Sequence, residues 1–232
     1  MFWTYGPKQA QETPPAMAKL SDLIPTLARI LPMPEQTVAV IARALRQERL
    51  ISTGGRGPGA AEMTPDDCAN LLLAIMAADQ VKDAVDAVRE FRSLTMEAVH
   101  CRDAAADGEE DDWLPLPPAM RRLLVVRDFG EMLSGLIAAA RDEVLHKALD
   151  DVALPFMKIE VERRFRTASV SLSGSSNELA PPQPVLIATF GIPEGPERER
   201  IEQEDFAAGG DAMITFAIGH RTIIALGALI RS

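Results

Sequence analysis

Apolar residues recur at helical spacing in two neighbouring segments near the start of the chain. In residues 20–31 the apolar positions are Leu20, Leu23, Ile24, Leu27 and Leu31. In the segment that follows they are Val38, Ile41, Ala42 and Leu45. Spacings of three and four residues place such positions on one side of a helix. The sequence Pro32-Met33-Pro34 interrupts the pattern between the segments, so we expect two short helices joined by a tight turn.

A short hairpin is expected directly after the second helix. Leu50-Ile51-Ser52 is the first strand, residues 53–59 form a glycine-rich tip, and residues 60–63 return toward the core. Because glycine has no side chain, the backbone of such a tip can approach another molecule closely.

The rest of the chain changes from helical to strand periodicity. Thr64-Pro65-Asp66-Asp67 is a helix-start signal, and that helix continues through Met76 before a second one at about residues 81–99. A long helical pattern returns at residues 118–151. From Pro155 onward, strand-like runs alternate with loops at residues 174–184 and 193–210. We expect an α+β fold, in which an N-terminal helix-turn-helix and helical region precede a C-terminal sheet-containing unit.

Five segments follow from these patterns. Residues 1–16 are expected to be a flexible extension, residues 17–100 the helix-turn-helix with its hairpin and supporting helices, and residues 101–118 an acidic and proline-rich linker. Residues 119–154 are a helical segment, and residues 155–232 a β-rich or α+β unit. The sequence leaves two roles open for the apolar residues at 213–218 and 223–230, which are self-association and packing in the hydrophobic core.

Composition and charge narrow the class of protein. Of the 232 residues, 47% are hydrophobic and 25% are charged, which is ordinary for a globular chain. No apolar run reaches the roughly 18 residues needed to cross a bilayer, and the first residues lack the features of a signal peptide. We expect no membrane partner and a cytoplasmic location. The net charge of −10 argues against a protein that coats nucleic acid, yet residues 17–62 carry six basic and four acidic side chains, a local balance of +2.

The polar side of the second helix has the composition of a surface that reads DNA. Its outward positions are Gln36, Thr37, Val40, Arg43 and Gln47. In a major groove, Gln reads adenine, Arg reads guanine, and the methyl groups of Val or Thr contact that of thymine. Arg46 and Arg49 lie toward the helix end and suit phosphates. Arg56, at the hairpin tip, suits a narrow minor groove.

This segment resembles winged helix-turn-helix DNA-binding proteins. Arg43-Ala44-Leu45-Arg46 through Leu50-Ile51, followed by the Gly/Arg hairpin as the wing, carries the resemblance. The order of elements is also similar to that of uncharacterised proteins encoded by phages and prophages. The resemblance implies a non-enzymatic, sequence-specific double-stranded DNA-binding protein that regulates transcription in a phage or mobile element. Helix and wing carry only four arginines, so we expect a homo-oligomer to supply further affinity.

Two other functions remain open for the same residues. One is the DNA-recognition subunit of a phage packaging or replication machine, which resembles small terminase subunits in plan and works as a ring. The other is a winged-helix adaptor that binds proteins, with Gln36, Arg43 and Gln47 merely solvated. A dimer favours the regulator, a large ring favours the packaging subunit, and an adaptor binds no duplex.

No motif in the sequence indicates an enzyme, a metal site or a cofactor. Residues 54–59 lack the spacing and the GK[ST] ending of a phosphate-binding loop, and the serines at 169–176 lack a nucleophile motif. Cys68 and Cys101 form no disulfide framework, and the adjacent His100 and Cys101 are poorly placed to share a metal ion. The six carboxylates between residues 103 and 112 do not follow EF-hand spacing, so a solvated linker is expected there.

Overall fold

The structure of the protein is a computed structural model that describes residues 18–55, 59–101, 116–150, 152–175, 182–208 and 214–231. The expected extension at residues 1–16, most of the linker at residues 101–118, and Arg56 at the hairpin tip lie outside the described residues. The helices are α1 (Leu20–Ile30), α2 (Glu35–Gln47), α3 (Pro65–Ala77), α4 (Ala84–Arg92), α5 (Phe129–Arg141), α6 (Val144–Asp150), α7 (Pro196–Ala208) and α8 (His220–Leu229), with 3-10 helices η2 (Val81–Asp83) and η3 (Pro118–Val125). The strands are β1 (Thr95–Cys101), β2 (Ala153–Glu162), β3 (Thr167–Ser175), β4 (Gln183–Gly191) and β5 (Thr215–Gly219).

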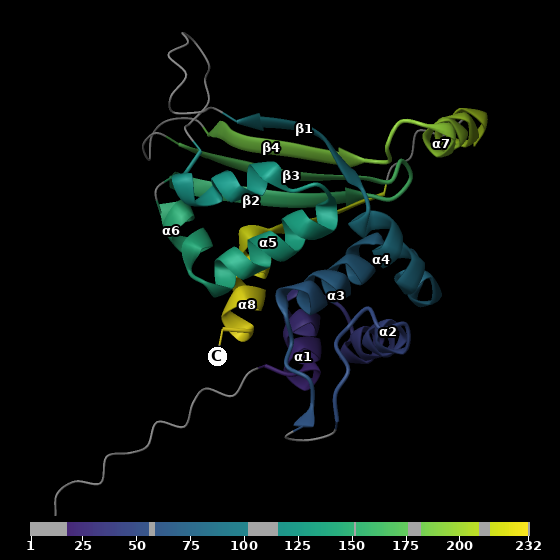
Figure 1. Ribbon diagram of the computed structural model, residues 1–232, viewed down its shortest axis with the longest axis vertical. Coiled ribbons are helices and arrows are strands. Elements are labelled where there is room, and N and C mark those ends of the chain that lie inside the picture. Colours follow the sequence, from purple (N-terminus) through teal and green to yellow (C-terminus); the bar gives the residue numbers. More distant parts are fainter. Residues whose placement is uncertain are drawn as a thin grey trace, which may run out of the picture.

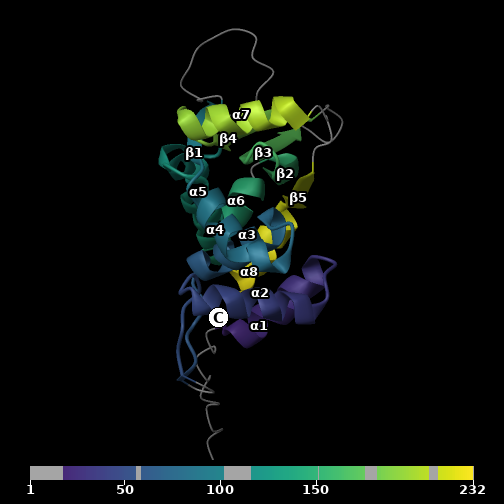
Figure 2. The same cartoon turned by 90° about the vertical axis from the view of Figure 1, so that its right-hand side faces the viewer.

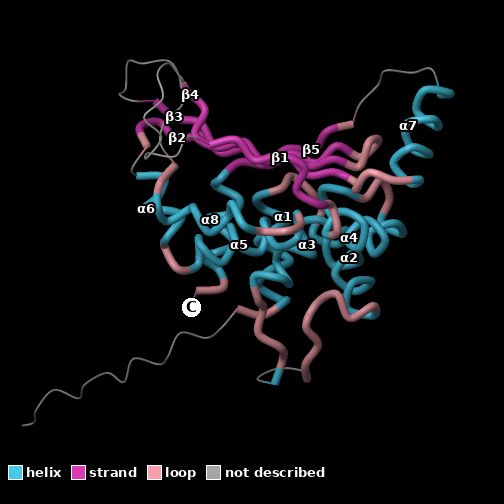
Figure 3. The backbone as a smooth tube through the Cα atoms, turned by 45° about the horizontal axis from the view of Figure 1, so that its top comes forward, coloured by secondary structure: helices cyan, strands magenta, loops and turns pink. Residues whose placement is uncertain are grey.

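An antiparallel sheet in the order β1-β4-β3-β2-β5 forms one layer of the molecule. Helices α5, α6 and α8 lie against one of its faces (Figures 1 and 3). On that face, alternate residues of β2 such as Met157 and Ile159 are buried, and Phe129 of α5 packs on Phe190 of β4 with ring centroids 5.3 Å apart. The register pairs Ile159 with Val170, so apolar side chains of adjacent strands share the covered face. The alternation of apolar and polar residues after Pro155 is explained by this one-sided packing.

Helix α3 is the centre of the helical layer. Every residue from Asp67 to Ala77 is buried, because α2, α4 and α5 pack around it. Its start follows the predicted signal: Thr64 Oγ1 accepts the Asp67 N–H at 3.1 Å, and the Asp67 carboxylate accepts the Thr64 N–H at 2.8 Å. Together, the helical layer and the sheet confirm the expected α+β fold, with helices first and most of the strands after them.

The predicted helix at residues 81–99 is wrong in its second half. Helix α4 ends at Arg92, and Thr95–Cys101 is an edge strand that pairs with β4. Local periodicity did not reveal the end of the helix, because Phe91 before it and Leu94 after it are both buried and continue the helical spacing of apolar residues. The Leu94 carbonyl accepts the Phe129 N–H at 2.9 Å, which fixes the turn into the strand.

Two further expectations about helices are corrected. The single long pattern at residues 118–151 is divided into η3, α5 and α6. Asp128 caps the start of α5 by accepting the Glu131 N–H at 2.8 Å, and Glu143, with φ of 60°, separates α5 from α6. The expected loop at residues 193–210 contains helix α7, which has no continuous apolar stripe but carries an Arg200–Glu204 ion pair at 2.8 Å.

Several of the C-terminal apolar residues belong to the core of the chain, whereas Ile214 is 59% exposed. Ile218, Ile223, Leu226 and Ile230 are all buried. Helix α8 packs closely on α5, and a methyl group added at Gly227 would lie in contact with Ala140 and the Arg141 backbone. Of the two uses left open for these residues, core packing accounts for the buried ones. Among the described residues, no helix has the length and hydropathy to cross a membrane.

Candidate nucleic-acid interface

Helices α1 and α2 form the predicted pair across a tight turn. Leu23 and Leu27 of α1 are fully buried, as are Val38 and Leu45 of α2. The N–H of Leu31 closes α1 by donating to the Leu27 carbonyl at 2.9 Å. The pair lies at the opposite end of the molecule from α7 (Figures 1 and 2). Both predicted helices are therefore confirmed.

The outer side of α2 is open to solvent along its length. Gln36, Val40, Arg43 and Gln47 are exposed, and Thr37 is half-buried at the edge of the contact with the core. Their spacing of four, three and four residues makes the exposed residues one stripe. Val40 is 43% exposed, so its methyl groups are accessible on this side of the helix. The structure thus brings the predicted reading residues together on one accessible face.

Two arginines lie where α2 ends. Arg46 and Arg49 are both exposed, as predicted. Arg49 has φ of 58°, and the following residue, Leu50, donates its N–H to the Leu45 carbonyl at 2.9 Å, which closes the helix. Glu48, the acidic residue between them, is held by Arg89 of α4 at 2.6 Å. This ion pair reduces the local negative charge beside the two arginines.

The expected wing differs from a regular hairpin. Residues 50 and 51 are bends and Ser52 has no regular secondary structure, so they do not form a strand. The paired backbone in this region is an isolated bridge between Lys19 and Glu62. The prediction of a first wing strand is therefore wrong, because Leu50 and Ser52 direct their backbone groups to α3 instead of to a partner strand. A hollow of about 620 Å³ lies between this segment, the start of α1 and Arg46 at the end of α2.

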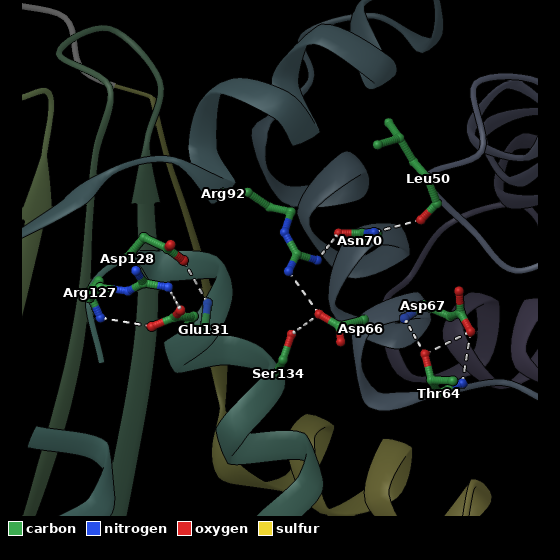
Figure 4. A network of polar contacts seen from close by, with 10 residues as sticks. All are labelled: Leu50, Thr64, Asp66, Asp67, Asn70, Arg92, Arg127, Asp128, Glu131 and Ser134. Carbon is green, nitrogen blue, oxygen red and sulfur yellow. Dashed lines mark hydrogen bonds and ion pairs between the residues drawn. The ribbon is translucent and has the colours of Figure 1, made fainter. Parts of the chain in front are cut away.

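Side chains of α3 and α4 hold the segment after α2, and the sequence did not reveal them as site residues (Figure 4). Asn70 Nδ2 donates to the Leu50 carbonyl at 2.5 Å, and the Ser52 N–H donates to Asp67 Oδ1 at 2.7 Å. Arg92 donates to Asn70 Oδ1 at 2.5 Å. The sequence held one sign of these contacts, since Asn70 is a polar residue inside the apolar run of α3. In the structure Asn70 is only 6% exposed.

Cys68 of α3 is fully buried. Burial raises the pKa of the Cys68 thiol to about 12, so this cysteine stays protonated and unreactive at neutral pH. Within the described part of the chain, His, Cys, Asp and Glu side chains do not gather in groups of three or more that could hold a metal ion.

Comparisons with models of known protein families, with characterised proteins and with solved structures find no match. Function is therefore inferred from the geometry of the residues themselves.

Proposed function

We propose that the protein is a non-enzymatic, sequence-specific double-stranded DNA-binding protein that uses α2 as its recognition helix. The observation that carries the proposal is the exposed stripe of Gln36, Val40, Arg43 and Gln47 on a helix at one end of the molecule. A major groove of B-form DNA admits one α-helix, and these side chain types match the donor, acceptor and methyl pattern of its base edges.

The charges around α2 support the same function. Arg43, Arg46 and Arg49 are exposed on α2 or directly after it, and Arg89 offsets Glu48. Although the whole chain has a net charge of −10, residues 17–62 carry a balance of +2. A locally basic end on an acidic molecule favours DNA approach from that end and disfavours binding elsewhere. We further propose that the protein regulates transcription, in keeping with the resemblance of its α1–α2 segment to such regulators.

The test compares arginines at the two ends of the molecule. Arg43→Ala and Arg46→Ala are each expected to weaken binding to a labelled duplex, Arg43→Ala by about tenfold because base contacts contribute about 1 to 3 kcal/mol. The matched control is Arg200→Ala, which removes one exposed charge from α7 at the far end. Fluorescence anisotropy across a salt series measures the affinities.

The same titrations separate base contacts from phosphate contacts. Loss of a phosphate contact at Arg46 lowers the slope of log affinity against log salt by about one. If the Arg43→Ala/Arg46→Ala double variant bound duplex DNA as well as the unmodified protein, α2 would not be the recognition helix. Failure of the unmodified chain to bind any duplex at moderate salt would favour a protein-binding adaptor.

A further inference from the structure

A polar network that is buried at Asn70 and partly exposed at Arg92 and Asp66 joins the end of α2 to the rest of the helical layer (Figure 4). Leu50 is its point of attachment, because its N–H bonds back to Leu45 in α2 while its carbonyl accepts Asn70 Nδ2 of α3. Leu50 therefore adds a hydrogen-bonded link between the end of α2 and α3 to the apolar packing of α2 on α3. Ser52, bonded to Asp67 at 2.7 Å, provides a second link two residues later.

Arg92 and the Leu50 carbonyl together fix the orientation of the Asn70 amide. A guanidinium only donates, so Asn70 must present its oxygen to Arg92, at 2.5 Å, and its nitrogen to Leu50. Without Arg92, Asn70 Oδ1 loses its donor, and the Leu50 carbonyl alone is left to hold the amide in place. Asn70 is buried, so water is poorly placed to replace the lost donor.

Arg92 is itself held from two sides. Its second terminal nitrogen donates to Asp66 at 2.7 Å, and Asp66 also accepts the Ser134 hydroxyl of α5 at 2.9 Å. Gly130 of α5 leaves room for the guanidinium, since a methyl group there would lie 2.8 Å from Arg92 Nε. Arg92 thus connects α5, which packs on the sheet, with the segment that ends α2.

We propose that Arg92 is a positioning residue for DNA recognition, which acts through Asn70 and the Leu50 carbonyl to fix the recognition helix before DNA arrives. This inference rests on the proposed function of α2. Arg92 need not touch DNA for this role. Preorganisation of this kind raises affinity by reducing the ordering that binding would otherwise require.

Two variants break the network at different links. Arg92→Met removes the guanidinium but keeps an unbranched side chain. Asn70→Asp has nearly the same shape and keeps an acceptor for Arg92, but it replaces the donor to Leu50 with a negatively charged oxygen. Both are expected to accelerate amide hydrogen exchange at residues 50–52 about tenfold, because the segment opens more often. Both should also weaken duplex binding by about three- to tenfold, because one or two side chains would then have to become ordered when DNA binds.

Two controls separate positioning from loss of charge and from general destabilisation. Arg127→Met removes an exposed arginine that pairs with Glu131 at 2.9 Å, outside the network. Gly227→Ala loosens the α5–α8 contact without touching residues 50–52. Neither is expected to change exchange at residues 50–52 or DNA affinity, when all proteins are compared well below their unfolding temperatures.

The salt dependence of binding distinguishes positioning from direct contact. Arg92→Met should lower affinity at every salt concentration while the slope stays unchanged, whereas a phosphate contact by Arg92 would reduce the slope by about one. A reduced slope, unchanged exchange at residues 50–52, or unchanged affinity would each overturn the inference. An unmodified protein that binds no duplex would overturn the proposed function itself, and this result differs from a protein that binds equally well with and without Arg92.

Discussion

Arg49 occupies a backbone conformation that favours glycine. Arg49 follows the last turn of α2 and has a φ of 58°. Glycine is the residue most often found in this conformation at the end of a helix. Retention of an arginine in this conformation places a positive charge at the end of the proposed recognition helix. The residue therefore combines a local backbone cost with a position suited to a DNA phosphate.

Replacement of Arg49 should separate these two effects. Arg49→Gly is expected to raise the free energy of unfolding by about 0.5 to 1 kcal/mol, since the strained Cβ is removed, and to lower the salt slope of DNA binding by about one. Arg49→Ala is the control, because it loses the same charge but keeps Cβ. Urea unfolding and salt titrations measure both quantities. A glycine variant less stable than the alanine variant would contradict this account of the helix end.

Asp66 makes the polar network sensitive to acid. Partial burial raises the pKa of its carboxyl. Hydrogen bonds from Arg92 and Ser134, together with the charge of Arg92, lower the pKa by more than burial raises it, so it lies below the ordinary 3.8. A carboxyl with a lowered pKa in the folded state stabilises the fold above its unfolded pKa, and this contribution is lost as the pH falls through the folded value.

The acid sensitivity can be tested with Asp66→Asn. The variant is expected to be less stable than the unmodified protein at about pH 5. The difference should shrink when urea unfolding is repeated at a pH below the lowered pKa of the folded carboxyl, where that carboxyl is protonated. An equal difference at the two pH values would show that the charge of Asp66 contributes nothing to stability.

The contact between α5 and α8 depends on the absence of a side chain at Gly227. A methyl group there would meet the backbone of α5 at Ala140 and Arg141, which cannot move aside as a flexible side chain can. Gly227→Ala should therefore lower the free energy of unfolding by about 1 to 2 kcal/mol, because the cost of overpacking exceeds the helix propensity gained.

Gly135→Ala, within α5, is the matched substitution. Its added methyl group would lie 3.1 Å from the end of the Leu123 side chain, which can adjust. We expect this variant to be as stable as the unmodified protein or more stable, as measured by thermal or urea unfolding. If Gly227→Ala were the more stable of the two, the close packing of α8 on α5 would be wrong.

The elements that the sequence predicted are those with a local signal. Helices α1 and α2 followed from their apolar spacing, and the start of α3 followed from Thr64 and Asp67. Strand β1 did not, because its pairing with β4 joins Thr95 to Gly191, far away in sequence. Helix α7 has too little apolar periodicity to be recognised, and ion pairs help to hold it.

The candidate site was predicted in part for the same reason. The exposed face of α2 is a property of one helix, so Gln36, Arg43 and Gln47 could be identified from spacing alone. The contacts of Asn70 with Leu50 and Arg92 depend on how three elements pack, and no local pattern encodes them. The expected wing strand was wrong because α3 supplies the partners of Leu50 and Ser52.

The molecule as a whole places its candidate interface at one end, away from the sheet and α7 (Figures 1 and 2). A transcription regulator that used this end would gain affinity as a symmetric dimer, with two recognition helices about one turn of DNA apart. We therefore expect sedimentation to give a dimer and the bound DNA to contain an inverted repeat with half-sites about 10 base pairs apart. A large ring of subunits would contradict the regulator and favour a DNA-packaging subunit.

The central claim is that α2 reads DNA sequence, and selection of bound duplexes from a random library by the purified protein tests it most directly. The account predicts enrichment of a defined motif by the unmodified protein and by Arg200→Ala, and loss of that enrichment with Arg43→Ala. Recovery of unselected sequences by the unmodified protein, or the same motif from the Arg43→Ala variant, would contradict it.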